Sequence, residues 1–312
     1  MSDEEFENEI LYRFLEYFLN NECELGDVTS TKIAAQFSTL EGFLNFEFEK
    51  FKDMRSADGY KLIRGFGDDY IGRIRTKLRF INPSLSVNEN FIQSIGREFI
   101  RQNLQNIQEL KLAHLNPNPF LINILNLREI DEMVEFLVFQ RVSRSIVTSF
   151  GTCVENLLIA SGSQKLTKGF DIIKIIDDVS HYIQVKSGTS DMDKDQIKYW
   201  QKKIEEIEAE GHFGYIGMTY GKDDENAISI SLMKSYLPNW EARTLIGKEL
   251  WEFVSGEADF HLKVLERIKK AAEEILRLNS IVDEIENTTK RITDEFKEKY
   301  GNDIESYIKS LF

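Results

Sequence analysis

The sequence predicts an α+β fold in which helices precede and follow a small mixed β-sheet. Three observations support this prediction. Apolar residues recur with helical spacing through most of the first 112 residues. Short β-branched runs appear between residues 170 and 230, and helical spacing returns from Gly247 to about Lys299. The 312 residues suffice for one large domain or two, since domains commonly hold roughly 100–200 residues.

The N-terminal part is predicted to be helical. An apolar stripe over residues 4–20 predicts a first helix, and helical spacing resumes over 31–52 after Gly26-Asp27. Four glycines between residues 55 and 72 indicate a turn-rich connection. A further helix is predicted over 89–112.

The main domain boundary is predicted at residues 116–119, which read NPNP. Proline cannot continue a helix and biases the residue before it towards extended geometry. We therefore expect a helical N-terminal domain over residues 1–114 and a second domain over residues 115–312.

The second domain is expected to begin with helices over 127–159, divided near Gly151. The apolar period then changes to that of strands. The runs 170–176 and 181–186 predict a β-hairpin, because Asp177-Asp178 between them is a turn signal.

A helix over 194–210 and strands over 214–220 and 227–230 are expected to follow, and helices complete the chain. In the C-terminal part an apolar 3/4 alternation suits either a dimer seam or a helix packed on its own core, and we favour the seam. Its members are Leu265, Ile268, Ala272, Ile275, Val282 and Ile285.

The charge distribution limits the partners of the protein. The net charge of −14 argues against indiscriminate binding of polyanions. Residues 1–50 hold 3 basic and 12 acidic side chains, whereas residues 60–102 hold 8 basic and 4 acidic ones. Only a local basic surface is therefore available to a polyanion, and scattered surface charge is the slightly favoured interpretation of residues 60–102.

Composition also bears on the compartment. Hydrophobic residues make up 42% and charged residues 29%, ordinary values for a globular protein. No apolar run approaches the ~18 residues of a transmembrane helix, and the acidic N-terminus is unlike a secretory signal. Two distant cysteines cannot form a disulfide framework. We expect a cytoplasmic protein without a membrane partner.

The hairpin carries the chemistry. Asp171 begins its first strand, and Gln184, Val185 and Lys186 lie on the second. Because strand side chains alternate, Gln184 and Lys186 share a face, and antiparallel pairing can bring Asp171 beside it. Glu155, on the preceding helix, could supply a second carboxylate.

These residue types suit metal-assisted hydrolysis of a phosphodiester. Carboxylates and a backbone carbonyl are the hard oxygen ligands that Mg²⁺ prefers. A bound metal activates water and polarises the phosphate, and a lysine can orient the water and offset charge in the transition state. On residues alone, a turn-flanking Asp171 and a solvated Lys186 are about as probable as catalytic ones.

The chain resembles the PD-(D/E)XK nuclease superfamily through Asp171, Gln184-Val185-Lys186 and the upstream Glu155. Blocks around this motif resemble one type II restriction endonuclease family, whose best-known member cuts an interrupted palindrome built on GGNCC. The blocks are residues 116–120 (NPNPF), 150–155 (FGTCVE), 217–221 (GMTYG) and 247–258 (GKELWEFVSGEA). The similarity extends from about Leu115 to Ile275.

The resemblance implies a homodimeric, Mg²⁺-dependent endonuclease that cuts double-stranded DNA and leaves 5′-phosphates, with Mn²⁺ able to substitute. It implies a palindromic site with a GG…CC core and a DNA methyltransferase as genetic partner. Asp171, Gln184, Lys186 and Glu155 would be catalytic, and the metal would be held by Asp171, Glu155 and the carbonyl of Val185. The domain 115–312 would be catalytic, and the domain 1–114 would serve DNA binding or dimerisation.

Two positions depart from the family motif. Phe170 replaces a proline that supplies only backbone shape, and Gln184 replaces the usual Glu or Asp. The second change removes a charge from the metal site, which Glu155 could make up.

The residues after the catalytic strand are candidates for DNA contact, although a solvated surface is equally compatible with them. They are Ser187, Thr189, Ser190, Lys194 and Lys198. Two other functions stay open: a superfamily nuclease of repair or phage defence without strict sequence specificity, and a non-catalytic DNA-binding protein.

Overall fold

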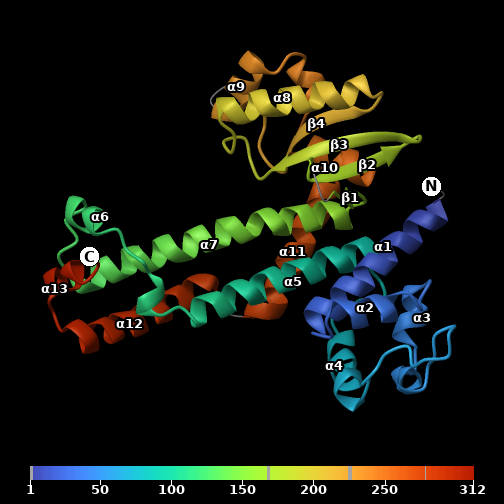
Figure 1. The fold of residues 1–312 in the computed structure, drawn as a ribbon, viewed down its shortest axis with the longest axis horizontal. Helices are drawn as coiled ribbons and strands as arrows, with labels where there is room; N and C mark the ends of the chain where they lie inside the picture. The colour runs from blue at the N-terminus through green and yellow to red at the C-terminus, as the bar shows by residue number, and fades with distance from the viewer. Residues whose placement is uncertain (1–2, 167–168, 224–226, 278) are drawn as a thin grey trace. The chain divides into compact units, whose positions relative to one another are not determined.

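The computed structural model describes residues 3–166, 169–223, 227–277 and 279–312. These residues form helices around one small sheet, so the α+β prediction is confirmed (Figure 1). Two compact units are present. The sheet unit comprises Met1–Glu98 and Cys153–Ala271, and the helical unit comprises Phe99–Thr152 and Ala272–Phe312.

The sheet has five strands in the order β1-β2-β3-β4-β5. They are β1 (Gln164–Lys165), β2 (Ile172–Ile176), β3 (Val179–Lys186), β4 (Phe213–Met218) and β5 (Thr244–Ile246). The first three pair antiparallel, whereas β3, β4 and β5 run parallel. The predicted hairpin is therefore confirmed as β2–β3, and its turn residues Asp177 and Asp178 both adopt positive φ.

Helices cover both faces of the sheet. On one face, α8 (Lys194–Ala209) and α9 (Ile228–Tyr236) pack on Ile216 and Met218 of β4. On the other face, α10 (Lys248–Ser255) packs so closely that a Cβ on Gly217 would lie 3.0 Å from Leu250. Figure 1 shows α8 lying along the strands. The buried sheet is thus a rigid base for the side chains at its strand ends.

The predicted strand over 227–230 is wrong, because its described residues enter the helix α9. Ile230, Met233 and Leu237 are buried at helical spacing, and the buried Ser229 hydroxyl donates to the Met192 carbonyl. A run of only four residues shows too little of either period for the sequence to separate strand from helix.

The N-terminal helices are more fragmented than predicted. They are α1 (Asp3–Tyr17), a π-helical turn (Phe18–Glu22), α2 (Asp27–Ala34), α3 (Leu40–Leu44), a 3₁₀ turn (Phe48–Lys52), α4 (Asp68–Leu78) and α5 (Val87–Gln108). The helical stretch predicted over 31–52 is interrupted, because a cluster of phenylalanines packs edge to face and requires short segments. Phe37, Phe43, Phe46, Phe48 and Phe51 form this cluster.

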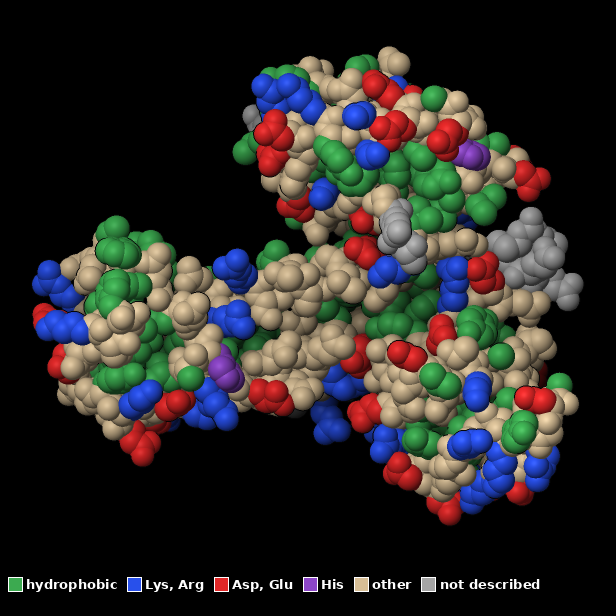
Figure 2. Space-filling view, viewed as in Figure 1, with side chains coloured by type: hydrophobic (Ala, Val, Ile, Leu, Met, Phe, Trp, Pro, Cys, Tyr) green, Lys and Arg blue, Asp and Glu red, His purple; other side chains and the backbone are tan. Residues whose placement is uncertain are grey.

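One member of the basic segment 60–102 is not available to a polyanion. Arg97 is buried and bonded to the buried Glu22, with Nη2 to Oε1 at 2.6 Å. Ser94 donates to the same carboxylate oxygen. Elsewhere in this segment Arg73 and Arg75 pair with acidic neighbours, and Figure 2 shows basic and acidic side chains interspersed over the face that carries α2–α4.

Loss of this buried ion pair should strongly destabilise the fold. Arg97→Ala leaves the Glu22 carboxylate buried without its main partner, so we expect the free energy of unfolding to fall by about 3–5 kcal/mol. Urea denaturation measures the change. The matched control is Arg73→Ala, which removes an exposed i,i+4 pair with Asp69 and an exposed hydrogen bond to the Glu24 carbonyl, and it should lower stability by only about 1 kcal/mol. If Arg97→Ala lowered the free energy of unfolding as little as Arg73→Ala does, the expectation would be contradicted.

The helical unit has its own core, to which α12 contributes Ile292 and Phe296. The elements that lie in this unit or enter it are a 3₁₀ turn (Leu112–His114), α6 (Pro119–Ile124), α7 (Ile130–Ala160), α12 (Ile281–Tyr300) and α13 (Ile304–Lys309). The helices do break at 116–119, since α6 starts at Pro119 with Asn118 as its cap, but this break lies inside the helical unit and the domain boundary predicted there stays a prediction. The division predicted near Gly151 is wrong, because α7 is continuous through it.

The helical run predicted from Gly247 to about Lys299 forms three helices, α10, α11 (Phe260–Leu276) and α12, and Ser280 caps the last of them. Leu265 and Val282 of the predicted dimer seam are 62% and 60% exposed. No helix in the described ranges is long and apolar enough to span a bilayer. Both cysteines are buried and free.

Candidate active site

The β2–β3 hairpin places Asp171 directly opposite Gln184. The register pairs Ile172 with Ile183, so the residue before β2 meets the residue after Ile183. The backbone N–H of Asp171 donates to the Ile183 carbonyl at 3.2 Å. The Gln184 side chain donates from Nε2 to the Oδ2 atom of Asp171 at 2.5 Å. The predicted convergence of these two side chains is present.

The same carboxylate oxygen also accepts from the backbone N–H of Val185 at 2.7 Å. This second bond ties Asp171 to the strand that ends with Lys186. Gln184 and Lys186 lie two residues apart on β3 and share a face, whereas Val185 points to the opposite face and is buried. Asp171 and Lys186 are therefore brought to one end of the sheet on one face.

The electrostatic surroundings of Asp171 include four neighbours. Burial raises the pKa of the Asp171 carboxyl above its usual value, and the Val185 N–H lowers it. The Glu155 carboxylate raises this pKa, while Lys186 and Lys165 lower it. Glu155 and Lys186, both predicted for the catalytic site, thus act on Asp171, together with Lys165, which the sequence did not single out.

Glu155 lies near the C-terminal end of α7 and is part-buried. Its Oε2 atom lies 3.4 Å from the Nζ atom of Lys165 on β1. This ion pair orients the Glu155 carboxylate beside the antiparallel part of the sheet. A signal for Lys165 was absent from the sequence, because β1 is only two residues long.

The oxygen donors fit a hard cation. Within the described residues no group of three or more His, Cys, Asp or Glu side chains is arranged to hold a metal ion, so a metal would need amide or carbonyl oxygens beside Asp171 and Glu155. Gln184 provides such an atom: its Oε1 is buried and has no hydrogen-bond partner among the described residues. Its Nε2 makes a second, long contact of 3.4 Å to the Val185 carbonyl, another predicted ligand.

Hydrogen bonds join the ends of β3 and β4 next to Lys186. Thr219 follows β4, and its N–H donates to the Lys186 carbonyl at 3.1 Å while its hydroxyl donates to the Ser187 carbonyl at 2.7 Å. The Trp251 indole donates to the Thr219 carbonyl at 2.8 Å. The sequence assigned no role to Thr219 and Trp251, because they lie 32 residues apart and meet only in the folded sheet.

The predicted DNA-contacting residues lie just beyond this end of β3. Ser187 and Thr189 are half-buried, and Ser190 is exposed. Lys194 and Lys198 lie on the first turns of α8, with their Nζ atoms 4.9 and 5.4 Å from the centre of the Tyr236 ring. Both lysines are exposed.

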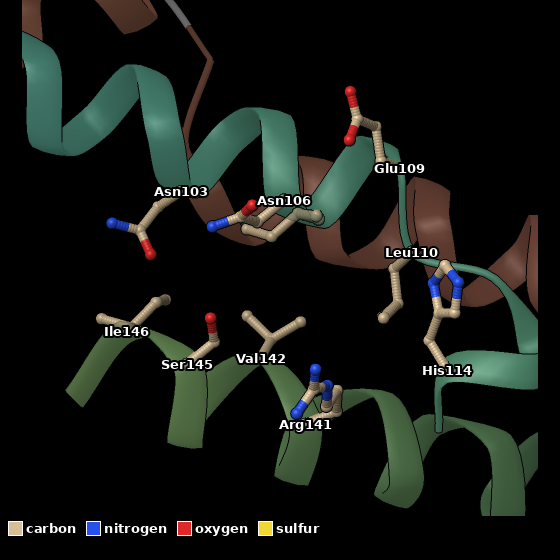
Figure 3. Close-up of a pocket in the computed structure, with 10 residues that line it drawn as sticks. Asn103, Asn106, Glu109, Leu110, His114, Arg141, Val142, Ser145 and Ile146 are labelled. Atoms are coloured by element: carbon tan, nitrogen blue, oxygen red, sulfur yellow. The ribbon is translucent and has the colours of Figure 1, made fainter. Parts of the chain in front are cut away.

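A separate pocket of about 240 Å³ lies within the helical unit between α5 and α7. Asn103, Asn106, Ser145 and Arg141 line it together with His114, as Figure 3 shows. None of the predicted site residues borders this pocket.

Comparison with known proteins agrees with the chemistry of the hairpin. Residues 86–275 match the family model described as type II restriction endonuclease EcoO109I. The chain belongs to this family. The match covers 190 of the 312 residues and contains the whole sheet with Asp171 and Lys186.

The EcoO109I family region begins earlier than about Leu115, where the sequence blocks placed its start. It includes all of α5, whereas residues 1–85 lie outside it. No curated protein matches the chain significantly. Membership identifies the chain as a restriction endonuclease, a nuclease whose substrate is DNA.

Proposed function

We propose that the protein hydrolyses phosphodiester bonds of double-stranded DNA at a specific site, with Mg²⁺ as cofactor, and leaves 5′-phosphates. The observation that carries this proposal is the meeting of Asp171, Gln184 and Lys186 at one end of the β2–β3 hairpin. Family membership supports the activity class, and the geometry supports these residues as its site.

Asp171, Glu155 and the Val185 carbonyl would hold the metal, and the free Gln184 Oε1 is a further donor. When bound, Mg²⁺ supplies Lewis-acid polarisation of the phosphate and a more acidic water. Asp171 is fixed for this task by its two hydrogen bonds from β3. Mn²⁺ has the same preference for oxygen ligands and should substitute.

Lys186 would orient the attacking water and offset the charge that develops on the phosphate. A lysine ammonium serves as a compact point charge with three donors. The hydrogen bonds of Thr219 to the carbonyls of Lys186 and Ser187 fix the backbone that carries this side chain. A charge partner held in place before the reaction stabilises the transition state without further reorganisation.

The surface beyond β3 would contact the duplex. We propose that the hydroxyls of Ser187, Thr189 and Ser190 donate to phosphates or base edges, and that Lys194 and Lys198 neutralise phosphates. These groups lie on the segment that runs from the end of β3 into the first turns of α8.

We propose a palindromic target with a GG…CC core and a homodimer that matches its twofold symmetry. The exposed Leu265 and Val282 are compatible with a protein interface. Residues 1–114 would serve DNA binding or dimerisation, and residues 115–312 catalysis. A DNA methyltransferase would be the genetic partner, and the enzyme would act in the cytoplasm.

Incubation with plasmids of known sequence, with and without Mg²⁺, tests the function. Discrete fragments that appear only with Mg²⁺ support site-specific cleavage, and ligation of the ends without kinase treatment checks for 5′-phosphates. A smear would indicate the alternative nuclease of repair or phage defence. Intact plasmid under all metal conditions would contradict the proposal and favour a non-catalytic DNA-binding protein.

Removal of the Glu155 charge tests its place in the metal site. In Glu155→Gln we expect the Mg²⁺ concentration for half-maximal cleavage to rise about tenfold or more, because a ligand charge is lost. Glu135→Gln is the matched control, since Glu135 is an exposed acid on the same helix α7. An unchanged Mg²⁺ requirement in Glu155→Gln would remove Glu155 from the metal shell.

A further inference from the structure

Tyr220 is an exposed aromatic residue at the active-site end of the sheet. It lies two residues beyond the end of β4, and β4 runs parallel to β3 with Met218 paired to Lys186. Its side chain is 60% exposed. Within the part of the chain that the structure describes, its hydroxyl makes no hydrogen bond to a protein group, and the ring belongs to no aromatic cluster.

The hydroxyl end of the ring lies against the backbone of Gly188. A Cβ atom on Gly188 would lie 2.5 Å from Cζ and 2.6 Å from the hydroxyl of Tyr220. Any larger residue at position 188 would therefore displace the ring. Gly188 is two residues beyond Lys186, a separation of roughly 7 Å along an extended chain.

The loop that carries Tyr220 is fixed on its other side as well. Gly221 has φ +115°, and a Cβ there would lie 2.4 Å from Cγ2 of Thr189. Gly247 has φ +55°, and a Cβ there would lie 2.7 Å from the Gly221 carbonyl oxygen. The loops after β3, β4 and β5 are thus interlocked through glycine contacts, and Thr219 adds the two hydrogen bonds described above.

The Tyr220 ring presents an exposed aromatic face beside the loop that follows Lys186. Tyrosine supplies a large contact area with little loss of conformational freedom, and residues of this kind dominate binding interfaces. The only macromolecule that must reach Lys186 is the DNA substrate, and Tyr220 borders that position. The Thr189 side chain lies beside Gly221 in the same loop as Tyr220.

We infer that Tyr220 is a substrate-positioning residue whose exposed ring face packs against the nucleotide next to the scissile phosphate. This inference rests on the proposed function, because it requires duplex DNA at Lys186. The ring would hold the sugar or base so that the phosphate lies in register with Lys186 and Asp171. It would act through shape and stacking, whereas Lys194 and Lys198 would act through charge.

The experiment uses the full chain and the duplex that carries the cleavage site mapped on plasmid DNA. Affinity is measured in Ca²⁺, which takes oxygen ligands as Mg²⁺ does, and single-turnover cleavage is measured in Mg²⁺. Tyr220→Ala is expected to weaken binding about tenfold or more, the scale of an interface hot spot. Tyr220→Phe keeps the ring and should stay within about threefold of the wild type in both measurements.

Two further variants separate stacking from local structure. Tyr220→Leu keeps bulk over Gly188 but has no flat face, so it should bind as weakly as Tyr220→Ala. Phe213→Ala removes a ring that is 49% exposed at the opposite end of the same strand, and it should bind like the wild type. Thermal denaturation reports whether each variant is folded.

The outcomes distinguish the inference from the function on which it rests. Wild-type cleavage together with wild-type affinity in Tyr220→Leu and Tyr220→Ala would overturn the role of Tyr220 and leave the nuclease proposal intact. Equal losses in Tyr220→Phe and Tyr220→Ala would also overturn it, since the ring would then not suffice. Absence of cleavage and binding by the wild type would overturn both.

Discussion

Lys186→Ala is expected to lose DNA cleavage by at least about a thousandfold while it keeps its affinity for DNA. The ammonium group of Lys186 is the positive charge that β3 carries to the site, and Thr219 fixes its backbone. Removal takes away a group that acts mainly in the transition state, so the rate should fall and binding should persist. Single-turnover cleavage and equilibrium binding of the same duplex measure the two quantities.

Two further variants accompany Lys186→Ala. Lys186→Arg tests whether positive charge alone suffices, and Lys248→Ala is the control for loss of a surface lysine. Arginine keeps the positive charge but not the compact ammonium, so cleavage should remain far below the wild type. Lys248 is an exposed lysine at the start of α10, paired with Asp259 and Glu252, and its loss should leave the rate unchanged. Normal turnover in Lys186→Ala would refute the catalytic assignment.

Asp171→Asn is expected to abolish cleavage at millimolar Mg²⁺, with a loss of at least about a thousandfold. The substitution keeps the shape of the side chain but removes the carboxylate that accepts from Gln184 and Val185. Calorimetry should show that Mg²⁺ binding is lost as well. Asp177→Asn is the control, because Asp177 lies in the turn at the other end of β2 with φ 49°, a conformation that Asn tolerates.

The pH dependence gives an independent check on Asp171. Burial raises the pKa of this carboxyl above its usual value, so its protonated form persists to a higher pH than that of an exposed Asp. Protons and Mg²⁺ compete for the ionised form. Mg²⁺ affinity should therefore decline on acidification at a pH above the ordinary Asp range, and Glu155→Gln should shift the decline to lower pH. A decline at the ordinary Asp range in both proteins would contradict this.

The sequence predicted the central hairpin because its evidence is local. The β-branched runs on both sides of Asp177-Asp178 show the strand period, and both aspartates adopt the positive φ that this turn needs. Once the turn is placed, the register follows, and the pairing of Asp171 with Gln184 follows from the register. The residues of the site were therefore predictable as a set, although their roles remain predictions.

Other features depend on contacts that spacing does not show. Gly151 suggested a helix break, yet a single glycine costs a helix only about 1 kcal/mol, which the packing of α7 outweighs. The ion pair between Lys165 and Glu155 joins a helix to a two-residue strand without a sequence signal of its own. The meeting of Tyr220 with Gly188 likewise arises only when β3 and β4 lie parallel.

The amide at position 184 has a consequence for the order in which the reacting complex assembles. With Gln184 in place of an acid, the two carboxylates of Asp171 and Glu155 are balanced by the two ammonium groups of Lys186 and Lys165. A site with three carboxylates and no metal would carry a net negative charge that repels the DNA phosphates, and this site avoids that charge. We therefore expect the enzyme to bind its target DNA in the absence of divalent cations. The bound DNA should stay uncut until such cations are available.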